Sequence, residues 1–350
     1  MKRIIAFVLT VMMTVGLLAG CGDGGKEQRV VNVCSWGEYI DESLIGEFEA
    51  QTGIHVNYQT AESNETLYSL LQTGGADFDV IVPSDYMIGR LIDEGMLAEL
   101  DYSAIPNYDL IDPQYKSLSF DPENKYTVPY SWGTVGIIYN TKMVDEPITS
   151  WGAMFDEKYA GQVLMINNCY LGYDINTTDE AQLDEAFQLV KNAKDKGVYQ
   201  AFVMDEIFGK MEGGNAAIAM YYAGDYLTML ENNEDLAFVV PEEGSNWFVD
   251  AMCVLKSSQH KDEAEEWINF IASTESNLAN MDYIGYASPN LEALEGYPAY
   301  YEETYGEPLD EERYEIMAAP DDVLARCELY TNLPADTLTL YNDLWTELGI

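Results

Sequence analysis

Apolar runs and helical apolar patterns alternate along the chain from Val30 onward. The runs that predict strands in the first part of the chain cover residues 30–34, 54–58 and 78–82. Each run precedes a segment whose apolar side chains recur three and four residues apart, as in a helix, and these segments cover 41–52, 64–73 and 86–94. Gly53 and Gly74 stand where helix C-terminal caps belong. Such alternation predicts a parallel sheet with helices on both faces.

The alternation continues through the second part of the chain. Strands are predicted over residues 136–139, 163–166, 216–222, 236–240 and 248–255. Helices are predicted over residues 179–194, 261–273, 320–330 and 334–347. The helix over 261–273 has the clearest pattern, because one face carries Ala264, Trp267, Ile268 and Ile271. Trp132 and Trp267 are expected to pack in the core or between the lobes. The length is sufficient for two α/β domains.

The first twenty residues are predicted to be a signal peptide outside the fold. Lys2 and Arg3 precede an apolar run over 4–18 that is too short to span a membrane as a mature helix. The run ends in Leu18-Ala19-Gly20-Cys21, which resembles a bacterial lipobox and implies lipid attachment to Cys21. Residues 21–29 are then a polar, lipid-anchored tether. We therefore expect a protein on the outer face of the cell membrane; a plain secretory signal is the alternative.

Acidic residues dominate the charged composition. The chain has 61 acidic and 17 basic residues, a formal net charge of −44. Such a surface repels nucleic acid and anionic lipid, so we expect no nucleic-acid partner and no membrane contact beyond the anchor. The other cysteines, which are far apart in the sequence, are Cys34, Cys169, Cys253 and Cys327. Because the chain also has only two histidines, a zinc site is not expected. We expect the four cysteines to be buried free thiols, and one disulfide is the alternative. No metal or cofactor is expected.

Two aromatic rings and a carboxylate follow the first predicted strand, at Trp36, Glu38 and Tyr39. Ligands of open parallel sheets bind beyond the carboxyl ends of the strands. The segments 61–64 and 84–86 follow the next two strands, so we expect them at the same edge. Ring faces and a carboxylate suit a cation with an aliphatic body. Half-buried packing of the rings is the alternative interpretation.

Several motifs, in the same order, resemble the spermidine/putrescine-binding family, the substrate-binding proteins of bacterial polyamine ABC transporters. The likeness runs from about Val30 to the C-terminus and is carried by residues 35–39 (SWGEY), 62–66 (ESNET), 82–86 (VPSDY), 128–133 (VPYSWG), 176–179 (NTTD), 249–252 (VDAM) and 284–290 (IGYASPN). It implies an α/β, two-lobed, periplasmic-binding-protein-like fold of type II whose lobes are joined by strand crossovers. Lobe 1 would comprise residues 30–132 and 251–295, and lobe 2 residues 133–250 and 296–350.

The resemblance also implies which residues bind the ligand. It assigns stacking rings to Trp36, Tyr39 and Tyr86, a polar contact to Ser84, the carboxylate that pairs with an ammonium group to Asp250, and another ring to Tyr286. Tyr222 and Phe248 stand where the family commonly has tryptophan. The candidate ligand-binding residues are Trp36, Glu38, Tyr39, Ser84, Tyr86, Asn168, Tyr222, Phe248, Asp250 and Tyr286.

The sequence departs from the family after the strand at 163–166. Asn168 stands where an aspartate is expected, and the helix that carries a second acidic contact is missing after it. A buried ammonium group without a carboxylate is costly, so this loss weakens the prediction for a long polyamine. Asp225 and Glu38 are candidates to compensate. Asp85 is expected to cap the helix that begins near Tyr86 rather than to contact ligand.

The resemblance predicts a monomeric, extracytoplasmic lipoprotein, not an enzyme, that captures putrescine or spermidine and delivers it to an ABC permease and, through it, to the ATPase subunits. The alternatives within this fold are another small cation, ferric iron held by clustered tyrosines, or a degenerate copy that binds polyamine weakly. An exported glycosidase is a further alternative, because carboxylates beside aromatic rings also suit sugar chemistry.

Overall fold

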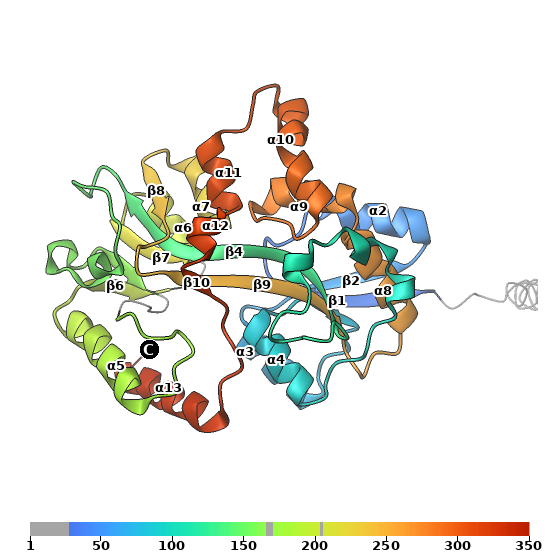
Figure 1. Cartoon of the computed structure of the whole chain (residues 1–350), viewed down its shortest axis with the longest axis horizontal. Helices are drawn as coiled ribbons and strands as arrows, with labels where there is room; N and C mark the ends of the chain where they lie inside the picture. Colours follow the sequence, from blue (N-terminus) through green and yellow to red (C-terminus); the bar gives the residue numbers. More distant parts are fainter. Residues whose placement is uncertain (1–27, 166–170, 204–205, 350) are drawn as a thin grey trace, which may run out of the picture.

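The computed structural model describes residues 28–165, 171–203 and 206–349 (Figure 1). Its strands form one sheet with the order β2-β1-β3-β9-β4-β7-β5-β6, while β10 pairs with β9 and β8 pairs with β4. The strands are β1 (Val30–Ser35), β2 (His55–Thr60), β3 (Val80–Ile81), β4 (Thr127–Asn140), β5 (Val163–Met165), β6 (Tyr199–Phe202), β7 (Ile218–Tyr222), β8 (Leu236–Val239), β9 (Ser245–Val254) and β10 (Cys327–Glu328).

Helices flank both halves of this sheet. They are α2 (Ser43–Thr52), α3 (Asn64–Thr73), α4 (Asp85–Asp93), α5 (Glu180–Asp195), α6 (Glu206–Glu212), α7 (Ala223–Asn232), α8 (Lys261–Ile271), α9 (Thr274–Ile284), α10 (Leu291–Tyr305), α11 (Glu311–Met317), α12 (Asp321–Leu324) and α13 (Ala335–Leu348). Short 3-10 turns lie at Tyr102–Ala104, Pro106–Leu110, Pro113–Tyr115, Trp151–Phe155 and Glu157–Tyr159. The predicted mixture of α and β structure is confirmed.

The first half of the sheet follows the sequence pattern closely. β1 runs parallel to both β2 and β3. The helices α2 and α3 end at Gly53 and Gly74, which adopt the left-handed conformation predicted for C-terminal caps. On α8, all four side chains of the predicted apolar face are buried, and Trp132 is buried as well. Local patterning therefore determined this half of the fold.

The prediction of a parallel sheet is wrong in the middle of the molecule. β9 runs antiparallel to both β3 and β4. β4 carries the chain from the first half of the sheet to the second, and β9 carries it back alongside, as Figure 1 shows. Two neighbouring strands that travel in opposite directions need no crossover helix between them. Trp132 lies opposite Val249 and Gly133 opposite Phe248, so these two strands join the halves.

The end of the chain also departs from the prediction. The helix expected over 320–330 is only the short α12, and it is followed by β10, which pairs with β9. Cys34, Cys253 and Cys327 are buried free thiols. Within the described residues, no helix combines the length and apolarity required to cross a membrane. The predictions for Cys21, Cys169 and Asn168 concern residues outside the described part of the chain.

Candidate functional site

The segments after β1, β2 and β3 meet at the edge of the sheet, as predicted. Ser84, at the end of the β3 segment, forms an isolated antiparallel bridge with Asp250 of β9. Its backbone N–H donates to Asn64 Oδ1 over 3.2 Å, and Asn64 Nδ2 donates to the Ser84 hydroxyl over 3.1 Å. These contacts bring the carboxyl ends of strands in the first half of the sheet next to Asp250.

Asp250 is the centre of this cluster. Its side chain is 4% exposed, and its Oδ2 accepts a 2.8 Å hydrogen bond from the Tyr39 hydroxyl. Its Oδ1 has no hydrogen-bond partner. Burial raises the pKa of Asp250 to about 6, although the nearby polar groups of Ser84, Tyr39 and Trp36 favour the charged form. None of the ion pairs among the described residues includes Asp250. The protein thus buries a carboxyl group without a cationic partner of its own.

Aromatic rings surround this carboxyl group. Tyr39 contacts Tyr130 and Tyr286, with ring centroids 5.4 Å and 5.6 Å apart. Phe248 lies edge-on to both Tyr286 and Tyr222, at 5.9 Å and 5.5 Å. These five residues, which we call the ring cluster, come from five places in the sequence. Ring faces attract cations and pack against methylene groups, so the ring cluster and Asp250 together suit an alkylammonium ion.

Tyr286 is held in a slot between two glycines. A Cβ atom added at Gly224 would lie 2.5 Å from the Tyr286 ring, and one at Gly133 would lie 3.0 Å from it. Real Cβ atoms essentially never approach a neighbour to 2.5 Å, so Gly224 must remain without a side chain. Gly133 lies on the crossing strand β4 and Gly224 on α7, so two segments far apart in the sequence position this ring.

The prediction that Asp85 caps α4 is wrong. Ser84 occupies the N-cap position, and Asp85 is the first residue of the helix. Asp85 is 1% exposed; its Oδ1 accepts a 2.6 Å hydrogen bond from Tyr86 N, while its Oδ2 has no partner. Burial raises the pKa of Asp85 well above its usual range, and the neighbouring Asp250 raises it further. The site therefore contains a second buried carboxyl group that the sequence pattern had assigned to a local role.

Two further carboxylates lie near Tyr222. Burial is the main cause that raises its pKa, and Asp250, Asp225, Glu65 and Asp85 all contribute. Glu65 also accepts a 2.8 Å hydrogen bond from the Tyr86 hydroxyl. Glu65 lay within one of the motifs that carry the family likeness, but nothing in that motif indicated a contact with Tyr86. Asp225, a predicted compensating acid, lies within electrostatic range of this ring.

Comparisons with known proteins show the family to which the chain belongs. Residues 43–305 match the family model described as "Bacterial extracellular solute-binding protein". The chain belongs to this family. The spermidine/putrescine-binding periplasmic protein of Salmonella typhimurium is 32% identical over 271 residues, which cover 74% of this chain and 77% of that protein. The family consists of solute-binding components of transporters and is not a class of enzymes.

Solved structures have the same fold as this extracellular solute-binding protein. The spermidine/putrescine ABC transporter substrate-binding protein of Streptococcus pneumoniae is 34% identical, with a TM-score of 0.77 over 92% of this chain and 98% of that one. The PotD lipoprotein of Treponema pallidum is 25% identical, with a TM-score of 0.79 over 91% of this chain and 99% of that one. The periplasmic-binding-protein-like fold predicted from the sequence is therefore confirmed.

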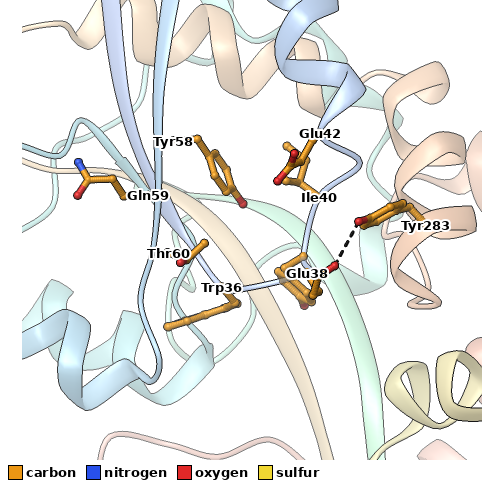
Figure 2. A pocket seen from close by; sticks show the side chains of 9 residues that line it. Trp36, Glu38, Ile40, Glu42, Tyr58, Gln59, Thr60 and Tyr283 are labelled. Atoms are coloured by element: carbon orange, nitrogen blue, oxygen red, sulfur yellow. Dashed lines mark hydrogen bonds between the residues drawn. The ribbon is translucent and has the colours of Figure 1, made fainter. Parts of the chain in front are cut away.

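The predicted ligand residues of this solute-binding protein fall into two groups. Hydrogen bonds, ring contacts or electrostatic proximity bring the first group together around Asp250: Trp36, Tyr39, Ser84, Tyr86, Tyr222, Phe248 and Tyr286. Glu38 instead points toward Tyr283 of α9, whose hydroxyl donates to Glu38 Oε2 over 3.2 Å (Figure 2). Tyr130, which the sequence analysis did not nominate, belongs to the ring cluster.

Proposed function

We propose that this extracellular solute-binding protein captures a linear di- or polyamine, putrescine or spermidine, and delivers it to an ABC permease. The observation that carries the proposal is Asp250, a buried carboxyl group with an unpartnered oxygen inside the ring cluster. An ammonium group would supply the missing partner, and the rings would cover the methylene chain. The names of the relatives from Salmonella typhimurium and Streptococcus pneumoniae support the same ligand class.

The proposal includes closure of two lobes on the ligand. The predicted boundaries place residues 30–132 and 251–295 in lobe 1 and residues 133–250 and 296–350 in lobe 2. The crossing of β4 and β9 between the halves of the sheet supports this division, because Gly133 and Phe248 face each other there. Tyr222 approaches from the second half and Tyr39 from the first. A ligand held between them binds the closed form more tightly and thereby favours closure.

Calorimetric titration with putrescine and with spermidine tests the function directly. Saturable heat with either amine, together with an increase in melting temperature, is the expected result. If neither putrescine nor spermidine produced saturable heat or raised the melting temperature, the proposal would be contradicted.

Ferric iron serves as a comparison, because burial raises the pKa of Tyr39, Tyr222 and Tyr286 and so disfavours the phenolates that bind ferric iron. We expect no visible colour when ferric citrate is added.

Amine binding is expected to depend on pH through Asp250. Its pKa in the empty protein is about 6, so below this value the carboxyl group must release a proton before it can pair with an ammonium group. We expect the dissociation constant for putrescine to change little between pH 7 and 8 and to rise by up to about tenfold per unit below pH 6. Titrations in buffers of different ionisation enthalpy would count the protons released. An equally steep pH dependence in Asp250→Asn would show that another group is responsible.

We also propose that Cys21 carries the lipid anchor, with the permease and its ATPase subunits as partners of a monomeric protein. The lipoprotein of Treponema pallidum supports this assignment by its name. In bacterial cells that express the full chain, Cys21→Ser should abolish incorporation of labelled fatty acid and release the protein from the membrane fraction. Cys34→Ser is the matched control, because Cys34 is a buried thiol within β1. Retention of Cys21→Ser in the membrane would contradict the anchor.

A further inference from the structure

Residues 329–334, which we call the strap, connect β10 with the C-terminal helix α13 (Figure 1). Both ends of the strap are fixed in the second half of the fold. Before the strap, Glu328 of β10 pairs with Asn246 of β9, and the Asn246 amide donates to the Glu328 backbone oxygen over 3.1 Å. After the strap, α13 packs against α5, where Lys191 forms an ion pair with Glu347. The strap is therefore carried by lobe 2.

Asn176 holds the strap on the same side as α5. Its Nδ2 donates to the Leu329 backbone oxygen over 2.9 Å, and its Oδ1 accepts from Thr331 N over 2.8 Å. Both polar atoms of one amide side chain thus bind the backbone of the strap. Asn176 begins the motif 176–179, which is part of the family likeness, and Asp179 of the same motif caps α5. The motif therefore joins the strap to α5, a role that the sequence did not indicate.

The strap reaches the first half of the fold along one face of α4. Asn332 Nδ2 donates to Asp93 Oδ2 over 2.9 Å, and a Cβ atom added at Gly89 would lie 3.5 Å from the Asn332 Cβ. Residues four positions apart share a face of a helix, so Asp85, Gly89 and Asp93 form one row along α4. Burial raises the pKa of Asp85, and a hydrogen bond from the backbone of Tyr330 opposes this rise. The row thus faces the strap from the first residue of α4 to the last.

The two attachments of the strap differ in strength. On lobe 2, strand pairing, the amide of Asn176 and the packing of α13 all hold it. On lobe 1, Asn332 is only half-buried and Asp93 is exposed, so their hydrogen bond contributes little net free energy. Gly89 lets the strap approach α4 closely without displacing a side chain. Separation of the lobes would therefore break the contact with α4 and leave the strap on lobe 2.

We propose that the strap is a latch between the two lobes: Asn332 binds the Gly89–Asp93 face of α4 when the lobes close, and this contact slows release of the bound amine. The latch rests on the proposed function, because closure on an amine brings Asn332 to α4. Asn332 is a positioning residue that holds the closed form. Since its contact favours the closed form alone, it should lower the dissociation rate of the amine and leave the association rate nearly unchanged.

A disulfide between Gly89→Cys and Asn332→Cys in the full chain tests the latch. The 3.5 Å between the two Cβ positions lies within the range of about 3.5–4.5 Å that a disulfide requires. We expect the disulfide to form about tenfold faster with saturating putrescine than without it, as measured by the loss of free thiols. The chain oxidised with putrescine bound should release it about a hundredfold more slowly than the same chain after reduction. Gly89→Cys alone is the control for the native cysteines.

Asn332→Ala tests the latch without a new covalent bond. We expect putrescine to dissociate about threefold to tenfold faster from this variant in stopped-flow measurements, because a hydrogen bond to a carboxylate is lost from the closed form. Asn342→Ala is the matched control, because Asn342 is an exposed asparagine within α13. This arm also covers the case in which the double-cysteine chain does not fold.

The outcomes separate the latch from the proposed function. In a chain that binds putrescine, equal rates of disulfide formation with and without putrescine would overturn the latch, as would equal dissociation rates for Asn332→Ala and the wild type. If the wild type bound neither putrescine nor spermidine, the proposed function would fail. Small-angle X-ray scattering of the empty double-cysteine chain would then decide the latch: oxidation should reduce the radius of gyration, and an unchanged radius would overturn it.

Discussion

Replacing Asp250 with asparagine is expected to weaken putrescine binding by about a hundredfold or more. An ammonium group would lose its buried carboxylate partner, and removing one member of a buried charge pair costs about 3–5 kcal/mol, which corresponds to more than two orders of magnitude in affinity. The side chain retains its size, so the ring cluster should remain in place. Calorimetry with putrescine at pH 7.5, well above the pKa of about 6 for this group, measures the effect.

The stability of the empty protein separates this effect from damage to the fold. The fold raises the pKa of Asp250 above its usual 3.8, so the folded chain holds the proton more tightly than the unfolded chain. Ionisation near neutral pH therefore costs stability, and Asp250→Asn should leave the free energy of unfolding unchanged or increase it. Glu47→Gln, on the exposed side of α2, should change neither the putrescine affinity nor the free energy of unfolding. Undiminished affinity in Asp250→Asn, with the fold intact, would refute the central role of this carboxylate.

Replacing Gly224 with alanine is expected to damage both stability and binding. The new Cβ would lie 2.5 Å from the Tyr286 ring and must displace it from the slot. Overpacking of this kind costs about 1–3 kcal/mol of folding free energy. Displacement of Tyr286 also moves it away from Tyr39 and Phe248, so putrescine affinity should fall by about tenfold. Urea denaturation and calorimetry measure the two effects.

The matched control for this substitution is Gly46→Ala on α2. A Cβ atom at Gly46 meets nothing within 4 Å, and the residue is exposed. Alanine should therefore stabilise the helix by about 0.5–1 kcal/mol and leave amine binding unchanged. If Gly224→Ala behaved like Gly46→Ala, the slot would not be needed to position Tyr286.

Asp85 shows where reasoning from local sequence fails. An acidic residue just before a helical pattern is ordinarily a cap, and the neighbouring Ser84 is an equally good candidate. The structure gives the cap position to Ser84 and buries Asp85 beside Asp250. Burial of a carboxyl group depends on what covers it. The covering strand β9 lies more than 150 residues further along the chain, so the local pattern contained no signal for it.

Glu38 shows that the sequence can place a loop correctly without revealing which way each of its side chains points. The sequence correctly identified Trp36, Glu38 and Tyr39 as residues at a strand end, because a β-branched run followed by polar and aromatic residues is a local signal. Adjacent residues in a loop can nevertheless face different neighbours. Tyr39 donates to Asp250, whereas Glu38 accepts from Tyr283 and, together with Tyr58 and Tyr283, lines a separate cavity (Figure 2). That division depends on the positive φ of Glu38 and on the position of α9, neither of which the loop sequence reveals.

The sequence by itself determined most helices and strands, the capping glycines, the family likeness and most of the residues around Asp250. These depend on periodicity and on short motifs, which act over a few residues. Only the tertiary structure decided that β9 returns antiparallel beside β4, that Asp85 is buried, and that Gly133 and Gly224 leave room for Tyr286. Each of these depends on contacts between segments far apart in the chain, whose free energy is set by the packing of the whole molecule.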